Sequence, residues 1–481
     1  MVDMKRRQFT LGLGAAGLAV AASPLMAATR IPRGGKIDVI VLGAGVAGLN
    51  AAFLLEQEGK RVLVLEGRKR VGGRVHTLFD LPGTPEMGFN SMGDAYGRGI
   101  GWAKRTGLEL IEVGKRYRLG KEQGLYLDGK LITRAEWATA SRNPFPEPYR
   151  TCMPWEASSV ALAKNNPLKE YTNWLEPESR PFDISLNAFL TAQGFSQEAI
   201  RLANDVSPFH GTTAHDVSAL MLEFGVGFTK NQLSAGPNLW SVKGGNELLP
   251  KAMAAILKGD LLLDKEVVAI DSRADIAEVR CADGSVYQAP RIVCTLPFAT
   301  LRSVHLTPGL TPLQSRAVAS LPYQRLSMAF LTASTPFWDA DGESAAMWTD
   351  GVLRTVTPQR YGASPEEITG FIVQARGLHA DVWDRMGSET ALKRIVAKLE
   401  ELRPAAKGKL TAHRMFSWCQ EYFNAGDWAY FAPGQISDFV PTMSRPAGRI
   451  HFCGEHTATN ARGLEGALES AERAALEVLS L

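Results

Sequence analysis

The sequence predicts an α/β fold whose main domain is a doubly wound, Rossmann-like parallel sheet. Residues 38–42, Asp-Val-Ile-Val-Leu, are the apolar, β-branched run typical of a buried parallel strand. Glycines in the spacing G-x-G-x-x-G follow at once, between residues 43 and 48. Residues 49–58 then read as a helix and residues 61–65 as a second strand. This order of strand, glycine loop, helix and strand is typical of a dinucleotide-binding unit.

Each part of that unit has a physical role. The first glycine turns the chain, the second lets the backbone approach a pyrophosphate, and the third lets the helix pack on the strand. The helix N-terminus offers unpaired N–H groups and the positive end of a dipole to the phosphates. An acid at the end of the second strand meets the ribose hydroxyls. We therefore expect a dinucleotide to be bound by Gly43, Gly45, Val46, Ala47, Gly48 and Glu66.

A second copy of the glycine pattern, at residues 12–17, is not predicted to bind a nucleotide, because no strand precedes it and no acid follows. Arg6, Arg7 and Phe9 precede a short, mildly apolar stretch instead. Residues 1–27 therefore resemble a twin-arginine export signal, which carries folded proteins to the periplasm. A disordered basic N-terminus on a cytoplasmic enzyme is the alternative. A membrane-spanning helix is disfavoured, because the stretch is short and rich in Gly and Ala.

Composition limits the remaining classes. A chain of 481 residues is expected to form two domains. A formal net charge of +3 gives no sign of nucleic-acid binding. Five cysteines without C-x-x-C spacing and eight histidines without ligand spacing predict no disulfide framework and no metal site. The sequence leaves open whether the chain is a monomer or a homodimer.

A further glycine pair follows Glu66, within the stretch Gly-Arg-Lys-Arg-Val-Gly-Gly-Arg of residues 67–74. It predicts another close backbone approach to a pyrophosphate, with cations from Arg68, Arg70 and Arg74. Near the other end of the chain, residues 449–453 read as a strand, Gly454 as a tight turn and Gly463 as the start of a helix.

Together these segments resemble the flavin-containing amine oxidases, the family of monoamine oxidase, polyamine oxidase and L-amino-acid oxidase. Residues 38–77 are similar to the N-terminal segment of that family and residues 448–479 to its C-terminal flavin-binding motif. Residues 239–257 and 261–297 follow in the family's order. The resemblance covers most of residues 37–481 and is thin between about 115 and 235.

The resemblance implies non-covalently bound FAD and two domains. The FAD-binding domain is expected from residues 35–100, 235–300 and 410–481, and a mixed α+β substrate-binding domain from residues 101–234 and 301–409. The backbone of Val267 would meet the adenine side, Glu455 the ribityl and phosphate part, and the helix N-terminus at Gly463 the flavin N1 and O2 atoms. The implied cofactor residues beyond the first loop are Gly67, Arg68, Gly73, Arg74, Asn90, Ser91, Val267, Gly454, Glu455, Gly463 and Leu464.

The implied reaction is oxidation of an amine to an imine by hydride transfer to flavin N5, after which water gives a carbonyl compound. Many members hold the amine between two aromatic walls. Trp428 takes the first wall position, but the second falls near Leu464, which is not aromatic. Trp418 matches the family's tryptophan close to the flavin ring.

The chain departs from the family where a lysine commonly holds a water at flavin N5, because Met328 stands there. Without that cation the reduced flavin would react slowly with O2. The departure favours a dehydrogenase that passes electrons to a periplasmic carrier such as a cytochrome c. In the alternative, another group replaces the lysine and O2 is the acceptor.

Two further departures concern substrate and flavin linkage. No arginine follows Glu86-Met87-Gly88, where amino-acid oxidases bind the substrate carboxylate, and Arg98 lies further on. An amine is therefore favoured over an α-amino acid, with L-amino-acid oxidase as an alternative. Asp427 stands where covalent members have Cys, which disfavours covalent flavin. A flavin-dependent desaturase and a flavin protein with a retired site are the other readings of the same scaffold.

Overall fold

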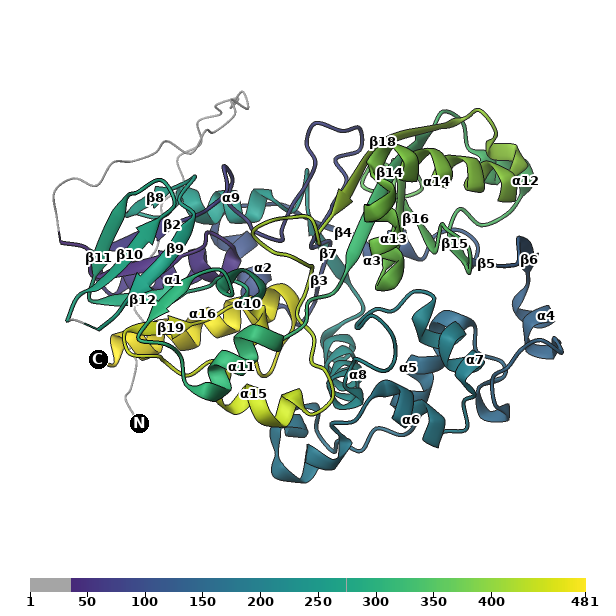
Figure 1. Ribbon diagram of the computed structural model, residues 1–481. Helices are drawn as coiled ribbons and strands as arrows, with labels where there is room; N and C mark the ends of the chain where they lie inside the picture. Colours follow the sequence, from purple (N-terminus) through teal and green to yellow (C-terminus); the bar gives the residue numbers. More distant parts are fainter. Residues whose placement is uncertain (1–35, 274) are drawn as a thin grey trace.

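In this computed structural model the described residues are 36–273 and 275–481 (Figure 1). The export signal predicted for residues 1–27 lies outside them. The central element is a parallel five-stranded sheet in the order β19-β12-β1-β2-β8, so the predicted doubly wound fold is confirmed. Its strands are β1 (Val39–Leu42), β2 (Val62–Leu65), β8 (Asp260–Leu262), β12 (Arg291–Cys294) and β19 (Ile450–Phe452).

The sheet is buried on both faces, which explains its continuous apolar strands. Val39 and Val41 of β1 pack with the small side chains of α1 (Val46–Gln57) and α16 (Gly463–Leu479). Ile40 and Leu42 point the other way, into a core shared with an antiparallel-rich four-stranded sheet. Its strands are β9 (Val267–Asp271), β10 (Ala277–Cys281), β11 (Val286–Ala289) and β13 (His305–Thr307).

A seven-stranded sheet lies at the other end of the molecule, in the order β18-β14-β17-β16-β15-β5-β6 (Figure 1). Helices α13 (Leu378–Met386) and α14 (Ser388–Leu402) share an apolar core with it. The strands are β5 (Gly124–Leu127), β6 (Lys130–Ile132), β14 (Leu326–Ala333), β15 (Met347–Thr349), β16 (Thr355–Gln359), β17 (Gly370–Arg376) and β18 (Leu410–Ser417).

The predicted domain boundaries stay a prediction, and one strand departs from them. Residues 410–417 were assigned to the FAD-binding domain, yet they form β18, which pairs with β14 along its length. β18 is an edge strand of the seven-stranded sheet. The alternation of apolar and polar residues predicts a strand but does not tell which sheet the strand joins.

A helical group hangs below the seven-stranded sheet in Figure 1. It comprises α4 (Arg134–Thr139), α5 (Pro154–Lys164), α6 (Leu186–Ala192), α7 (Gln197–Ile200) and α8 (Ala219–Ala235). The family resemblance is thin in this stretch. Residues 101–234 and 301–409 contain both helices and strands, as the predicted α+β substrate-binding domain requires.

Short elements join the larger parts. A three-stranded sheet has the order β3-β7-β4. The remaining strands and helices are β3 (Met92–Gly93), β4 (Leu110–Glu112), β7 (Leu239–Val242), α2 (Gly97–Arg105), α3 (Gly114–Tyr117), α9 (Leu248–Ala255), α10 (Phe298–Leu301), α11 (Pro312–Ser320), α12 (Phe337–Asp341) and α15 (Gln435–Met443).

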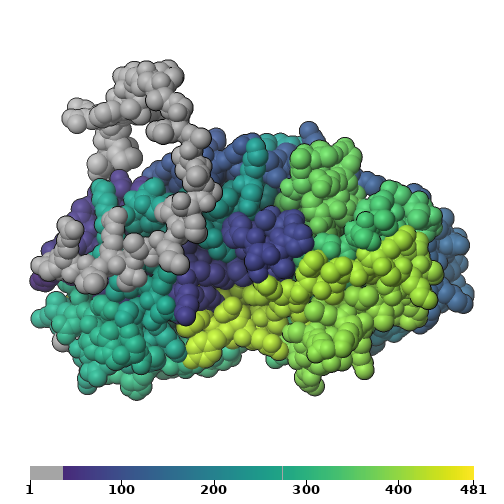
Figure 2. All heavy atoms as spheres, turned by 90° about the horizontal axis from the view of Figure 1, so that it is seen from above, coloured from purple at the N-terminus to yellow at the C-terminus, as the bar shows by residue number. Residues whose placement is uncertain are grey.

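The segment after β2 connects the two large sheets. Leu78 and Met87 of this segment pack with Met328 and Ile372 of the seven-stranded sheet. Seen from above, the early, purple part of the chain lies between its teal and green parts (Figure 2). In the described part of the chain, no helix has both the length and the apolar character needed to cross a membrane.

Candidate active site

A cavity of about 1270 Å³ is bordered by both large sheets. It runs from the glycine loop after β1, past the N-termini of α1 and α16, to side chains of β14 and β17. Of the residues predicted to bind the cofactor, those that line it are Gly43, Gly45, Val46, Ala47, Glu66, Gly67, Arg68, Gly73, Arg74, Asn90, Ser91, Gly454, Glu455, Gly463 and Leu464.

The glycine loop has the form that a phosphate requires. Gly43 has φ +99°, which L side chains rarely adopt. A Cβ on Gly48 would lie 1.9 Å from the Gly43 carbonyl oxygen, so the helix can pack only on glycine. A Cβ on Gly45 would meet nothing within 4 Å and would project into open space. No side chain caps α1, so its first N–H groups are left for an anion.

Glu66 is held in place at the end of β2. Its Oε2 accepts from the Ala44 backbone N–H at 2.8 Å, and its Oε1 accepts from the Arg68 backbone N–H at 2.9 Å. The side chain is 4% exposed and lines the cavity. The carboxylate is thus fixed beside the glycine loop, as ribose recognition requires.

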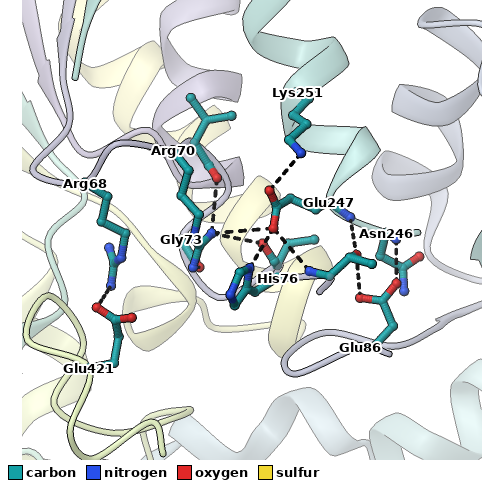
Figure 3. Close-up of polar contacts among 12 residues, drawn as sticks. Arg68, Arg70, Gly73, His76, Glu86, Asn246, Glu247, Lys251 and Glu421 are labelled. Atoms are coloured by element: carbon teal, nitrogen blue, oxygen red, sulfur yellow. Dashed lines mark hydrogen bonds and ion pairs between the residues drawn. The ribbon is translucent and has the colours of Figure 1, made fainter. Parts of the chain in front are cut away.

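The second glycine pair lies against the first loop. The Gly72 N–H donates to the Ala44 carbonyl at 2.8 Å, and Gly45 and Gly72 form a parallel bridge. Arg70 corrects one expectation, because its side chain does not line the cavity. Its Nη2 donates to the Gly73 carbonyl at 2.9 Å (Figure 3). Arg70 therefore stabilises the loop itself, although it was expected to contact a pyrophosphate.

Two buried carboxyl groups hold the chain around this loop. Glu247 Oε2 lies 2.7 Å from His76 Nδ1, and its Oε1 lies 3.0 Å from Lys251 Nζ (Figure 3). Glu86 accepts from the Asn246 backbone N–H at 2.6 Å. Burial raises the pKa of Glu86 to about 8, although that hydrogen bond opposes the shift. The loop is therefore a rigid wall of the cavity.

A buried ion cluster joins the loop to the C-terminal motif. Arg74 Nη1 donates to Glu455 Oε1 at 2.8 Å and to the Asp427 carbonyl at 2.8 Å. Arg462 Nη2 lies 3.9 Å from Glu455 Oε2. Burial opposes ionisation of Glu455, but these two arginines hold its pKa below the usual range. Glu455 is thus a fixed anion between two cations.

The N-terminus of α16 faces the same cavity. Gly463 begins the helix with φ +57°, and no side chain caps it. Leu464, in the first turn, is buried and lines the cavity. The positive end of the helix dipole is therefore available to a negative group bound there.

Arg68 and Phe423 line the cavity beside Gly67. The Arg68 guanidinium lies 5.1 Å from the Phe423 ring centroid and contacts Glu421 at 3.3 Å. A Cβ on Gly67 would lie 2.4 Å from that ring. Arg68 Nε and Glu455 Oε2 are buried without a hydrogen-bond partner among the described residues. Such orphaned groups, with the open Gly45 cradle, fit a bound dinucleotide.

Besides Arg70, three predicted residues do not line the cavity. Gly48 acts through helix packing. Val267 begins β9 and lies outside the lining, so its adenine contact stays a prediction. Trp418 is fully buried behind Gly88, where its indole N–H donates to the Met87 carbonyl at 2.6 Å. Its place close to the flavin ring also stays a prediction.

The predicted aromatic wall is present, and the structure adds to it. Trp428 lines the cavity and stacks on Phe209, with ring centroids 4.9 Å apart and an interplanar angle of 28°. No substrate fits between rings so close, so Phe209 extends the same wall. Tyr96 also lines the cavity, with its hydroxyl 3.9 Å from the Cβ that Gly463 lacks. It therefore brings an aromatic ring beside the residue that precedes Leu464, where the second wall was expected.

Met328 lies on the cavity wall formed by β14 and β17, and its place near flavin N5 stays a prediction. It is 3% exposed, pairs with Gln374, and its Sδ lies 3.6 Å from Gln374 Nε2. Two pairs further along, Arg376 faces Leu326 and lines the cavity. This arginine was not predicted, because nothing in the sequence near it marks a site. Only the antiparallel register of two distant strands brings it to the cavity.

Known proteins of one family are similar to this chain in sequence. A family model described as flavin containing amine oxidoreductase matches residues 46–479. Amine oxidase [flavin-containing] B of Homo sapiens is 28% identical over 468 residues, with 92% of this chain and 86% of the relative covered. The Sus scrofa protein of the same name is 26% identical over 477 residues, with the same shares covered.

Solved structures resemble the fold. Cyclohexylamine oxidase from Brevibacterium oxydans has a TM-score of 0.75 at 20% identity, with 93% of this chain and 99% of that chain covered. A wild-type putrescine oxidase bound to putrescine has a TM-score of 0.72 at 23% identity, with the same shares covered. At these identities the likeness concerns the fold alone.

The dinucleotide cradle, the cavity and the doubly wound sheet define a flavoprotein oxidoreductase. The chain belongs to the flavin-containing amine oxidoreductase family, as the match over residues 46–479 shows. It is an FAD-dependent enzyme that oxidises amines.

Proposed function

We propose that this enzyme is a dehydrogenase of small amines that works in the periplasm and passes electrons to a protein carrier such as a cytochrome c. The observation that carries the proposal is Met328, an uncharged side chain on the cavity wall where the family commonly has lysine. A fixed cation promotes electron transfer to O2 by stabilising the negative charge that develops on it. Without one, a carrier protein is the better acceptor.

The residues of the chain prepare the amine for oxidation. Bound FAD supplies a hydride acceptor for the carbon next to the amine nitrogen. Trp428 and Phe209 present an aromatic face that orients the substrate. Met328, Leu326 and Ile372 form an apolar wall that excludes water. The N-terminus of α16 favours negative charge at its end of the cavity.

FAD is proposed to be bound without a covalent link. Asp427 stands at the position of the covalent cysteine and lines the cavity. Among the described lining residues there is no cysteine or histidine that could form such a link. Retention of FAD would then depend on the buried contacts of the loop and the ion cluster around Glu455.

One anaerobic experiment tests this function. Primary, secondary and polyamines are titrated into the purified FAD-loaded protein while the visible flavin band is followed. We expect bleaching by one class of amine. No bleaching by any amine, with FAD demonstrably bound, would instead favour a desaturase-like reaction.

The electron acceptor is tested on the reduced enzyme. Protein reduced by its amine is mixed with air-saturated buffer or, under argon, with oxidised cytochrome c. We expect slow recovery of the flavin band in air and faster recovery with the cytochrome. Rapid recovery in air alone would make the enzyme an oxidase.

A further inference from the structure

Arg376 places a cation in the wall of the substrate side of the cavity. It is the last residue of β17, and its guanidinium carbon lies 5.0 Å from the Phe209 ring centroid and 5.7 Å from that of Trp428. Both rings line the cavity with it. Stacking on two aromatic rings holds the planar guanidinium in one orientation beside the expected position of the amine.

The charge of Arg376 is not balanced by the protein. Among residues 36–273 and 275–481, no carboxylate oxygen lies within 4.0 Å of its nitrogens. Its Nη2 donates to Gln374 Oε1 at 3.2 Å, and its Nε is buried without a partner. The contrast is with Arg74 and Arg403, which lie 2.8 Å from Glu455 and 2.7 Å from Asp341. A partly buried cation without a paired anion is costly, so it needs a functional reason.

The neighbouring titratable groups leave this region positive. Burial lowers the pKa of Arg376 to about 10, which keeps the guanidinium charged at neutral pH. Burial raises the pKa of Asp427 to about 7, so this carboxyl neutralises only part of the charge. Burial, with Arg462 and Arg376, lowers the pKa of His210 to about 3, and the ring is neutral.

We infer that Arg376 is a specificity-determining residue that binds a carboxylate of the substrate, so that the amine oxidised here carries a carboxylate group. A guanidinium and a carboxylate match each other through two parallel hydrogen bonds. Nε and Nη1 of Arg376 make no hydrogen bond within the described chain, and Nη2 gives only one of its two N–H groups to Gln374. One of the two bidentate edges, Nε–Nη2 or Nη1–Nη2, is therefore left for this contact. The inference rests on the proposed oxidation of a small amine and names its substrate class.

The other candidate arginine is committed elsewhere. Arg98, downstream of Glu86-Met87-Gly88, lies 3.2 Å from Glu465 and 2.9 Å from Glu472 and does not line the cavity. The missing arginine after Gly88 therefore does not exclude an anionic substrate. Here the cation comes from β17, on the side of the cavity that carries Met328 and Gln374.

Binding is tested separately from turnover. The FAD-loaded full-length protein is titrated with benzoate or phenylacetate, and with the corresponding neutral amides, while changes in the flavin spectrum are followed. These acids carry no amine and cannot be oxidised. We expect the carboxylates to bind roughly 30-fold or more tightly than the amides. Equal binding of acid and amide would overturn the inference.

Variants assign the effect to the residue. Arg376→Met is expected to remove the preference for carboxylates, and Arg376→Lys to retain part of it because the charge remains. Arg354→Met is the matched control, since burial also lowers the pKa of Arg354 to about 10 but this residue does not line the cavity. We expect it to bind carboxylates as the wild type does. Unchanged carboxylate binding by FAD-loaded Arg376→Met would refute the role of Arg376.

Matched substrates separate the two proposals. Anaerobic reduction is compared for 4-aminobutanoate against butylamine and for phenylalanine against phenethylamine. We expect the carboxylate member of at least one pair to have the lower half-saturation concentration, and Arg376→Met to raise it without changing that of the uncharged member.

If uncharged amines bleach the flavin but carboxylates bring no gain, amine oxidation stands and the inference fails. If no amine bleaches it, the proposed function fails, and the titration with benzoate still decides whether Arg376 binds carboxylates. Slower recovery of reduced Arg376→Met in air, with carboxylate binding intact, would instead assign this cation to O2.

Discussion

Met328 and Arg376 show how two residues on one wall divide the properties of the site. They lie on the paired strands β14 and β17, two residue pairs apart, and Gln374 contacts both side chains. The position that would favour O2 is apolar, and the cation stands further along, beside Phe209 and Trp428. We therefore expect the electron acceptor and the substrate to be selected by different residues.

Met328→Lys tests the first property. A cation close to the charge that develops on O2 stabilises it, so we expect reoxidation in air to become about tenfold faster or more. The measurement is stopped-flow recovery of the visible flavin band after mixing reduced enzyme with O2. Met328→Leu is the control, because it keeps volume without charge, and it should recover at the wild-type rate. A lysine variant no faster than Met328→Leu would show that this position does not govern the acceptor.

Glu223 makes the free energy of unfolding depend on pH. It is 2% exposed, its Oε2 has no hydrogen-bond partner in the described chain, and burial raises its pKa from 4.5 to about 7. The native state keeps the proton up to about pH 7, whereas the unfolded state loses it near pH 4.5. The free energy of unfolding therefore falls between these two pH values, by on the order of 3 kcal/mol.

Glu223→Gln should remove that loss. We expect the variant to melt a few degrees above the wild type at pH 8, and close to it at pH 5, where the native carboxyl is protonated. Differential scanning calorimetry at both pH values measures the difference. Glu389→Gln, at an exposed position, is the control and should show no such pH dependence. The same difference at both pH values would contradict the assignment to Glu223.

At the scale of elements, the glycine loop separates cofactor binding from folding. A Cβ on Gly45 meets nothing of the chain, so Gly45→Ala should leave the melting temperature of the FAD-free protein unchanged. The same Cβ would occupy the phosphate cradle and weaken FAD binding by about 1–3 kcal/mol. Gly48→Ala, whose Cβ meets the Gly43 carbonyl, should lower both stability and FAD affinity. FAD titration and thermal melts of the two variants measure this contrast.

Gly225→Ala supplies the control for these substitutions. Gly225 lies inside α8, and a Cβ there meets nothing within 4 Å. Removing a helical glycine should stabilise the protein by about 0.5–1 kcal/mol without any change in FAD affinity. Loss of FAD from Gly225→Ala, or unaltered FAD affinity in Gly45→Ala, would be inconsistent with the cradle described above.

Elements with strong local patterns were predictable from the sequence. The run 38–42 contains β1, the run 61–65 contains β2, and Gly463 opens α16 as expected. Helix α1 begins at Val46, three residues before the predicted 49, because the glycine loop itself provides the first turn. Arg70 and Arg74 could not be told apart, since both are cations beside the same glycines. Only the fold of the loop turns one inward and the other toward the cavity.

At the scale of the whole molecule, the cofactor side of the cavity was predictable and most of the substrate side was not. Fifteen positions could be expected around FAD because motifs at each end of the chain mark them. Phe209, Arg376 and Tyr96 come from three separate regions, and their approach to Trp428 or Gly463 depends on tertiary packing. No local sequence pattern encodes such contacts between residues that are far apart in the chain.

The predicted export signal concerns the whole chain. Replacing Arg6 and Arg7 by Lys should abolish recognition by the twin-arginine pathway while leaving the enzyme itself unaltered. Cell fractionation should then find the flavin-containing protein in the cytoplasm instead of the periplasm. Its flavin band should still be bleached by the amine. Lys5→Arg is the control and should still be exported. Equal periplasmic yield from the double variant would contradict this route.

The order of strands in the five-stranded sheet has a consequence for biosynthesis. Its central strand, β1, is made first, but its neighbour β12 follows some 250 residues later, and β19 and α16 come from the end of the chain. A nascent chain on the ribosome therefore holds only one half of the cradle. Loading with FAD has to await the synthesis of β19 and α16, and the half-built sheet is meanwhile exposed to chaperones and to aggregation. The supply of FAD in the compartment of synthesis would then set how much of the protein matures.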